Sequence, residues 1–276
     1  MAEMMTNLQE SKNLDELVNL GYTRIPKAFD AASVKWMLDR VIELKRTSPP
    51  PVNLPYLDRD PDFQIIYNLC LKDAKFLRLI LNQPQIMALL KARLNDPWFK
   101  SIPSEDPNFI LRSLNARSSG VAPMSIHIDS FVPSPGSFTW SMQLAVVLEE
   151  HTPENGATLL VPRSHLNDRY ASPADLDQAI PSLAQPGDAV LWDSRIWHAT
   201  LGNTSGKTRW SLIAGFVRWW VKQAFDITGS LPKEIYDQCT PQELAVLGFC
   251  SRPPEDETQS VDMKTGYENL AFNKSH

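Results

Sequence analysis

The pattern of hydrophobic and polar positions divides the chain into two parts, with a change near residue 107. Before the change, apolar residues recur at helical spacing over residues 30–47 and 74–94, and Pro84 interrupts the second segment. Asp30 stands where a helix N-cap is expected. The first hundred residues are therefore predicted to be mainly helical.

After residue 107, short apolar or alternating runs follow one another, with Pro, Gly, Asn and Asp between them. Six runs have the length and residue types of β-strands: 109–119, 125–131, 138–150, 156–165, 188–200 and 209–220. Short strands at this spacing are typical of a sandwich or a barrel. One further helix is expected near residues 240–249, and the Pro-rich loop 48–56 is a possible lid.

These elements predict a single catalytic domain over residues 1–276. Its expected parts are a mainly helical N-terminal part that packs on the sheet (1–106), a β core (107–220), and a C-terminal helix and tail (221–276).

Charge and composition exclude several partners. The net charge is −5 and the sequence pI is about 5.6, without a Lys/Arg-rich run, so no nucleic-acid partner is expected. No apolar run approaches the ~20 residues of a membrane helix, and the N-terminus lacks the pattern of a secretory signal. The three cysteines lack CxxC spacing, which indicates free thiols and a cytoplasmic protein. The oligomeric state is left open.

Candidate chemistry begins at "SIHIDSF", residues 125–131. On a strand, His127 and Asp129 would point to the same face, and together they supply two ligands for a divalent transition metal. His198 lies on another apolar run and is the candidate third ligand, because His151 and His165 lie in turn-like segments. Two histidines and one carboxylate form the facial set with which non-haem Fe(II) oxygenases leave coordination positions open.

Arg209 follows His198 by eleven positions, after a segment with turn chemistry. A hairpin of that length would return Arg209 to the metal end of the barrel, where its guanidinium can grip a carboxylate. A metal triad with an arginine at this distance suits 2-oxoglutarate, whose 2-oxo acid end chelates iron. Thr200, two residues after His198, could add a hydroxyl to the distal carboxylate.

The motifs "HIDSF", "NGATLLVPRSH" and "PGDAVLWDSRIWHATLGNTSGKTRWSL", in this order, resemble the phytanoyl-CoA dioxygenase family. The resemblance implies a double-stranded β-helix (jelly-roll, cupin-like) core with flanking helices, an Fe(II) cofactor, 2-oxoglutarate as cosubstrate and O2. It implies that His127, Asp129 and His198 bind iron and that Arg209 holds 2-oxoglutarate with Thr200. Two further cosubstrate contacts are implied at Asn115 and Gln143.

The reaction implied is oxidation of an unactivated C–H bond of a small-molecule metabolite, with release of succinate and CO2. Hydroxylation is the simplest outcome, and desaturation or ring closure stays open. Because Asp129 is present, oxygenation is favoured over halogenation, for which related enzymes replace this carboxylate. Phe131, Trp140 and Trp192 are candidate substrate-pocket residues. A natural-product intermediate is preferred over a CoA ester, because the chain has no basic patch. His165 and the Gly-Asp pair at 187–188 are interpreted as structural.

Two alternatives remain open. A jelly roll with these three ligands could hold zinc or manganese in a hydrolase or isomerase, although such an enzyme has no need of Arg209 and Thr200 as a dicarboxylate clamp. The chain could instead be a non-enzymatic module that binds 2-oxoglutarate or another metabolite. Activity that depends on 2-oxoglutarate and releases succinate distinguishes the three.

Overall fold

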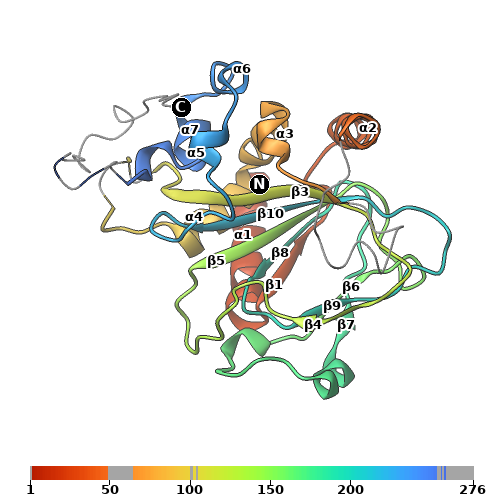
Figure 1. Ribbon diagram of the computed structural model, residues 1–276. Coiled ribbons are helices and arrows are strands. Elements are labelled where there is room, and N and C mark those ends of the chain that lie inside the picture. The colour runs from red at the N-terminus through yellow and green to blue at the C-terminus, as the bar shows by residue number, and fades with distance from the viewer. Residues whose placement is uncertain are drawn as a thin grey trace. The chain divides into compact units, whose positions relative to one another are not determined.

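The computed structural model describes residues 2–48, 65–99, 102–103, 105–253, 256 and 258 (Figure 1). The α-helices are α1 (Ala2–Asn19), α2 (Ala31–Thr47), α3 (Ala74–Leu81), α4 (Pro84–Leu94), α5 (Ile227–Ser230), α6 (Lys233–Tyr236) and α7 (Pro241–Val246). The strands are β1 (Tyr22–Ile25), β2 (Ile65–Ile66), β3 (Phe109–Arg117), β4 (Met124–His127), β5 (Ser141–Val147), β6 (Thr158–Leu160), β7 (Ile180–Pro181), β8 (Ala189–Asp193), β9 (His198–Thr200) and β10 (Ser211–Arg218). Short 3-10 helices are η1 (Leu69–Leu71), η2 (Ser164–Leu166), η3 (Pro173–Gln178) and η4 (Phe249–Ser251).

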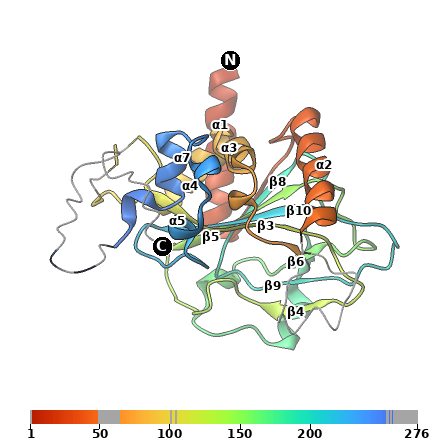
Figure 2. The ribbon, with the colours of Figure 1, turned by 45° about the horizontal axis from the view of Figure 1, so that its top comes forward.

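The strands form two sheets, one with the order β1-β8-β5-β10-β3-β2 and one with the order β4-β9-β6-β7. In the smaller sheet β4, β9 and β6 lie side by side with antiparallel pairing (Figures 1 and 2). In the larger sheet β1 pairs antiparallel with β8, and β2 pairs antiparallel with β3. The mainly β core with flanking helices is the architecture that the sequence predicts.

The chain forms two compact units. Unit 1 contains residues 1–67, 115–139 and 143–213, and unit 2 contains residues 68–114, 140–142 and 214–276. The predicted division into an N-terminal helical part, a core and a tail stays a prediction.

Unit 1 has an apolar core around β5, β6 and β8. Its buried members are Ala145, Val147, Leu160, Ala184, Val190, Trp192 and Ile196. A second, smaller cluster of Ile128, Val161 and Trp197 lies on the segments that follow β4, β6 and β8. Apolar packing thus fixes the segments on both sides of the candidate ligands His127 and His198.

Unit 2 has its own core, in which Phe99 stacks on Trp219 at 4.4 Å between ring centroids and Ala245 of α7 is buried. Arg78 of α3 donates from Nε to Glu243 of α7 at 2.7 Å, and this ion pair joins the two helices.

The predicted helices are confirmed. Asp30 caps α2 by accepting a hydrogen bond from the N–H of Ser33 at 2.6 Å. The apolar segment 74–94 forms two helices, and Pro84 occupies the first turn of the second, where its missing N–H costs nothing. The expected C-terminal helix is α7, which begins after a capping box between Thr240 and Glu243.

Three expectations about strands were wrong or incomplete. Strand β1 lies inside the part predicted to be helical, and its four residues are too few to show a periodic pattern. The run 125–131 is a strand only as far as His127, so Asp129 lies beyond it. The run 188–200 is not one strand, because a turn at 194–197 separates β8 of the larger sheet from β9 of the smaller one.

Residues 49–56 of the possible lid lie outside the described residues. No helix in the described part of the chain is long and apolar enough to cross a membrane.

Candidate metal centre

Three side chains of unit 1 converge with their ligand atoms toward one point. The ligand atoms of His127, Asp129 and His198 all lie within 4.8 Å of one another. Nε2 of His198 is 3.4 Å from one carboxylate oxygen of Asp129, and Nε2 of His127 is 3.8 Å from the other. Two imidazole nitrogens and one carboxylate at this separation can share a single divalent cation.

The other nitrogen of each imidazole faces a backbone carbonyl. Nδ1 of His127 lies 2.9 Å from the carbonyl oxygen of Ser125, and Nδ1 of His198 lies 3.1 Å from that of Ile196. A proton on Nδ1 satisfies these contacts and leaves the Nε2 lone pair directed at the cluster. Metal-binding histidines are usually oriented in this way.

Different elements bring the three ligands together. His127 ends β4 and stands opposite His198, the first residue of β9, in an antiparallel pairing. Asp129 is held by its backbone instead, because the N–H groups of Asp129 and Ser130 both donate to the carbonyl oxygen of Ser194 at 2.9 Å. Alternation along one strand, the basis of the sequence argument, is therefore not what places the carboxylate.

The electrostatics of the cluster favour a neutral imidazole. Burial, and next the neighbouring His198, lower the pKa of His127 to about 4. A neutral imidazole at neutral pH retains the lone pair that a metal ion requires.

Arg209 is a buried cation for which the described part of the chain offers no paired carboxylate. Its residue is only 7% exposed, and Nη1 donates to Nε2 of His151 at 3.0 Å, while Nε has no hydrogen-bond partner. Burial lowers its pKa to about 10, which leaves it charged at neutral pH. A buried charge with an unused donor can accept an anionic ligand.

The backbone on both sides of Arg209 is fixed by Glu149. Its carboxylate accepts from the hydroxyl of Thr208 at 3.1 Å and from the N–H of Trp210 at 2.7 Å. The Oγ of Ser211, one residue further on, lies 2.7 Å from Nε2 of His151. Glu149 therefore fixes the backbone on both sides of Arg209, and His151 contacts its guanidinium. Both residues belong to the segment that follows β5.

The family model described as Phytanoyl-CoA dioxygenase (PhyH) matches residues 18–211, which is more than half of the chain. The chain belongs to the phytanoyl-CoA dioxygenase family. Dioxygenase af480 of Aspergillus fumigatus is 28% identical over 255 residues, which cover 90% of this chain and 79% of that protein. Dioxygenase andF of Emericella variicolor is 34% identical over 110 residues, which cover 40% of this chain and 38% of that protein.

Solved structures with a similar fold include an epimerase and a protein with 2-oxoglutarate bound. The nogalamycin-biosynthesis epimerase SnoN, described as non-heme and alpha-ketoglutarate-dependent, has a TM-score of 0.61 and 19% identity over 77% of this chain and 84% of its own. HygX from Streptomyces hygroscopicus, solved with nickel and 2-oxoglutarate, has a TM-score of 0.60 and 15% identity over 77% of this chain and 88% of its own. The two antiparallel sheets with flanking helices are thus the jelly-roll fold predicted for this phytanoyl-CoA dioxygenase family member.

The remaining predicted cosubstrate residues lie on strands of unit 1. Thr200 ends β9, and its Oγ1 accepts from the N–H of Met124 at 3.3 Å, which leaves the hydroxyl proton free to donate. Asn115 of β3 and Gln143 of β5 are both buried. Their assignment as 2-oxoglutarate contacts stays a prediction.

The three predicted pocket residues have different surroundings. The ring centroid of Trp192 is 5.9 Å from that of His198, and its buried Nε1–H has no partner. Phe131 is 66% exposed, two residues after Asp129. Trp140 belongs to unit 2, where its carbonyl accepts from the N–H of Arg218. Their roles in a substrate pocket stay predictions.

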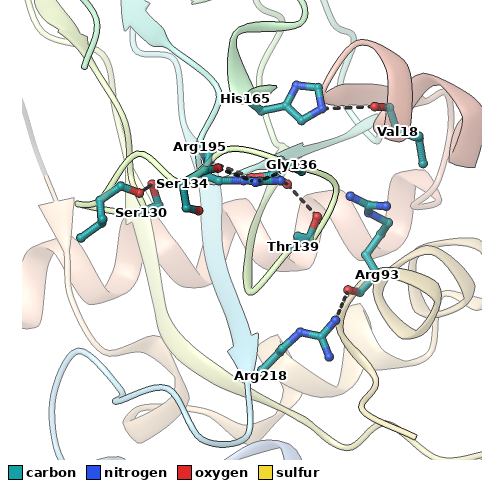
Figure 3. Close-up of polar contacts among 11 residues, drawn as sticks. Val18, Arg93, Ser130, Ser134, Gly136, Thr139, His165, Arg195 and Arg218 are labelled. Carbon is teal, nitrogen blue, oxygen red and sulfur yellow. Dashed lines mark hydrogen bonds and ion pairs between the residues drawn. The ribbon is translucent and has the colours of Figure 1, made fainter. Parts of the chain in front are cut away.

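Two sets of residues escaped the sequence argument. His151 was expected in a turn but is buried against Arg209. Asp193 and Arg195 form a buried ion pair in the turn that follows β8. Two charged residues inside the apolar run "AVLWDSRIW" were the signal for such a pair, because charges are seldom buried singly. His165, interpreted as structural, is buried, and its Nε2 lies 3.2 Å from the carbonyl oxygen of Val18 (Figure 3).

Proposed function

We propose that this chain is an Fe(II)- and 2-oxoglutarate-dependent oxygenase that oxidises a C–H bond of a small-molecule metabolite and releases succinate and CO2. The observation that carries the proposal is the pairing, within one family member, of a His127–Asp129–His198 cluster with the buried Arg209. A cation site alone would suit many enzymes. A buried guanidinium with an unused donor adds the need for an anion.

Each residue has a defined task in this proposal. His127, Asp129 and His198 would hold Fe(II) on one side and leave its other positions for ligands. Arg209 would bind the distal carboxylate of 2-oxoglutarate, and the Thr200 hydroxyl would donate to the same group. When bound, Fe(II) and 2-oxoglutarate supply the activation of O2 that oxidation of an unactivated C–H bond requires.

Fixed backbone contacts let the protein keep this arrangement without reorganisation. The Nδ1 contacts to Ser125 and Ile196 keep both imidazoles oriented, and Ser194 keeps the backbone of Asp129 in place. Burial of Arg209 excludes water from the guanidinium and strengthens its attraction for a carboxylate.

Hydroxylation is the simplest outcome that this arrangement supports. In this proposal Asp129 is the third metal ligand, so the proposal includes oxygenation and not halogenation. The similar structures include the epimerase SnoN and the carbocyclase SnoK from nogalamycin biosynthesis, so a similar fold also supports other reaction outcomes. Hydroxylation is therefore the specific product to be tested.

The deciding experiment is an anaerobic visible absorption spectrum of the purified protein with Fe(II) and then 2-oxoglutarate. A weak charge-transfer band is expected on addition of 2-oxoglutarate. It should be absent in His198→Ala and Asp129→Ala and weakened in Arg209→Ala, and oxygen should then give succinate.

Tight zinc or manganese binding without a band, and without succinate, would contradict the proposal and favour a hydrolase or isomerase. Binding of 2-oxoglutarate without succinate in any substrate screen would favour a binding module. Normal turnover by Asp129→Ala would refute the metal triad.

A further inference from the structure

A segment rich in exposed apolar side chains begins immediately after the candidate metal carboxylate. It spans residues 130–139, and Phe131, Val132 and Phe138 in it are 66%, 58% and 56% exposed. Tyr170, itself 59% exposed, donates its hydroxyl to the carbonyl oxygen of Phe131 at 2.8 Å. Exposed apolar side chains in a segment that adjoins a candidate metal site are candidates for contact with a small-molecule ligand.

Arg195 attaches the middle of this segment to the turn after β8. The residue is only 3% exposed, and Nη1 donates to the carbonyl oxygens of Ser134 at 2.8 Å and Gly136 at 2.9 Å (Figure 3). Its Nε and Nη2 donate to the carboxylate of Asp193 at 2.9 and 2.8 Å. The guanidinium thus links the segment to a buried carboxylate.

Both ends of the segment are fixed as well. At the far end the hydroxyl of Thr139 donates to Asp193 at 2.8 Å. At the near end the N–H of Ser130 donates to the carbonyl oxygen of Ser194, and its hydroxyl donates to Val132. Phe131 has a φ of +63°, a conformation that disfavours a large side chain and persists only where surrounding contacts impose it.

The same turn positions two of the candidate metal ligands. Ser194 holds the backbone of Asp129, and the carbonyl of Ile196 accepts from Nδ1 of His198. A buried ion pair is weak evidence for stability by itself, since an apolar replacement is often as stable. The Asp193–Arg195 pair also donates hydrogen bonds to loop carbonyls beside the candidate metal centre. This is better explained by a role in positioning the loop.

We propose that Arg195 is a positioning residue and that the Asp193–Arg195 pair with Thr139 holds segment 130–139 as a fixed apolar rim, which binds an apolar small-molecule substrate. The assignment of the bound molecule as substrate rests on the proposed function. The attachment of the rim and its affinity for apolar molecules do not.

Two kinds of variant distinguish the residues that hold the rim in place from the residues whose side chains form its apolar surface. Arg195→Lys keeps the charge but has one nitrogen in place of three, and Thr139→Val removes one hydroxyl at nearly constant volume. Phe131→Ser and Phe138→Ser keep the hydrogen bonds of Asp193, Arg195 and Thr139 and remove apolar surface.

Two matched controls exist in unit 2. Arg218 is 9% exposed and also donates to two backbone carbonyls, that of Arg93 at 3.2 Å (Figure 3) and that of Asn95 at 3.4 Å. Arg218→Lys therefore repeats the same chemical change at another buried site. Trp98 is 86% exposed, so Trp98→Ser controls for the loss of an exposed aromatic ring.

The measurements are amide hydrogen exchange of peptides that cover 130–139, binding of the neutral fluorescent apolar probe N-phenyl-1-naphthylamine, and binding of 2-oxoglutarate in the presence of Fe(II) without oxygen. In Arg195→Lys we expect exchange in 130–139 to rise by about tenfold, as for the loss of charge-assisted hydrogen bonds, and probe affinity to fall severalfold. Thr139→Val should show a smaller change in the same direction. Both serine variants should weaken the probe with exchange unchanged.

Affinity for 2-oxoglutarate should stay within about twofold of wild type in the two serine variants, which leave the turn at 194–197 unchanged. A merely structural defect would lower it together with probe affinity. The proposal is overturned if Arg195→Lys leaves exchange in 130–139 as in wild type, or if Arg218→Lys raises exchange there equally. It is also overturned if Trp98→Ser weakens the probe as much as the two phenylalanine variants.

Exchange and probe binding require neither metal nor cosubstrate. If 2-oxoglutarate fails to bind to wild type while hydrogen exchange and probe binding change as expected in the variants, the proposed function fails. The rim then stands as a binding site for apolar molecules.

Discussion

Arg209 shows at the scale of one residue how a binding site conflicts with stability. Its guanidinium is buried, keeps one unpartnered nitrogen and meets His151 in place of a carboxylate. In an apolar interior this arrangement costs free energy, which a bound dicarboxylate would return. The same side chain is thus expected to weaken the ligand-free protein and to strengthen its complex.

Replacement of Arg209 by methionine should therefore separate the two effects. We expect Arg209→Met to leave the unliganded protein as stable as wild type or more stable by about 1 kcal/mol, because an incompletely paired buried charge is removed. It should lose the thermal stabilisation that 2-oxoglutarate gives wild type. Thermal unfolding with and without the ligand measures both.

Arg218→Met is the control, because Arg218 donates to two carbonyls and its removal should lower the melting temperature. A large loss of stability in Arg209→Met, like that of the control, would contradict this account.

His151 makes the stability of the protein depend on pH. Burial, and next Arg209, keep the pKa of His151 well below its usual value of about 6.5. Between the pKa of His151 in the folded chain and its usual value, the unfolded chain binds a proton that the folded chain does not. The free energy of unfolding therefore decreases as pH falls below about 6.5. The limiting slope is about 1.4 kcal/mol per pH unit for one such group.

Urea unfolding at pH 7.5, 6.5 and 5.5, with Fe(II) excluded by a chelator, tests this expectation against His151→Gln. Because His127 titrates in the same direction, the difference between wild type and variant isolates His151. The wild type should lose more stability than the variant on acidification, and parallel pH profiles would show that His151 does not contribute.

Sequence spacing pointed to the candidate metal ligands and Arg209 because these residues lie on or beside short strands that are joined by turns. It missed His151, whose partners Arg209 and Ser211 are 58 and 60 residues away along the chain. A single histidine in "EEHTPENG" has the composition of a turn, and burial by distant residues leaves no local trace.

At the scale of elements, the strand argument named three residues that do lie together in the structure, but for a partly wrong reason. Alternation was invoked for His127 and Asp129, yet β4 ends at His127 and the turn at 194–197 holds Asp129. That turn was not recognised within the apolar run 188–200. Its two charged residues, Asp193 and Arg195, pair with each other, and the run around them has the composition of one continuous strand. Helices, which carry caps and a proline stop in the sequence, were predicted more accurately.

The turn that leads into β8 offers a test of an element whose conformation demands glycine. Gly187 has a φ of +94°, and a Cβ there would lie 2.6 Å from the carbonyl oxygen of Phe29. The strain and the clash predict that Gly187→Ala destabilises the protein by about 1–3 kcal/mol.

Chemical denaturation measures this loss, and Gly136→Ala is a useful comparison because a Cβ there meets nothing within 4 Å despite a φ of +93°. Gly136→Ala should show only the smaller cost of the backbone conformation. Equal losses in both variants would mean that the approach of Phe29 does not matter.

At the scale of the whole molecule, net charge bears on the substrate. The chain carries 27 basic and 32 acidic residues without a basic run, whereas CoA esters carry several phosphates. The exposed side chains after Asp129 include those of Phe131, Val132 and Phe138. Both features favour a neutral, apolar substrate over an acyl-CoA, although the family is named for an acyl-CoA enzyme.

We therefore expect phytanoyl-CoA and shorter acyl-CoA thioesters to leave succinate release at the rate seen without any substrate. Neutral apolar compounds of similar size should raise that rate, because their binding beside the candidate metal centre needs no phosphate contacts. Succinate release from 2-oxoglutarate is the measurement, at low and high salt. Stimulation by acyl-CoA that weakens as salt rises would reveal cationic contacts to its phosphates and overturn this expectation, since screening reduces such contacts and leaves apolar burial intact.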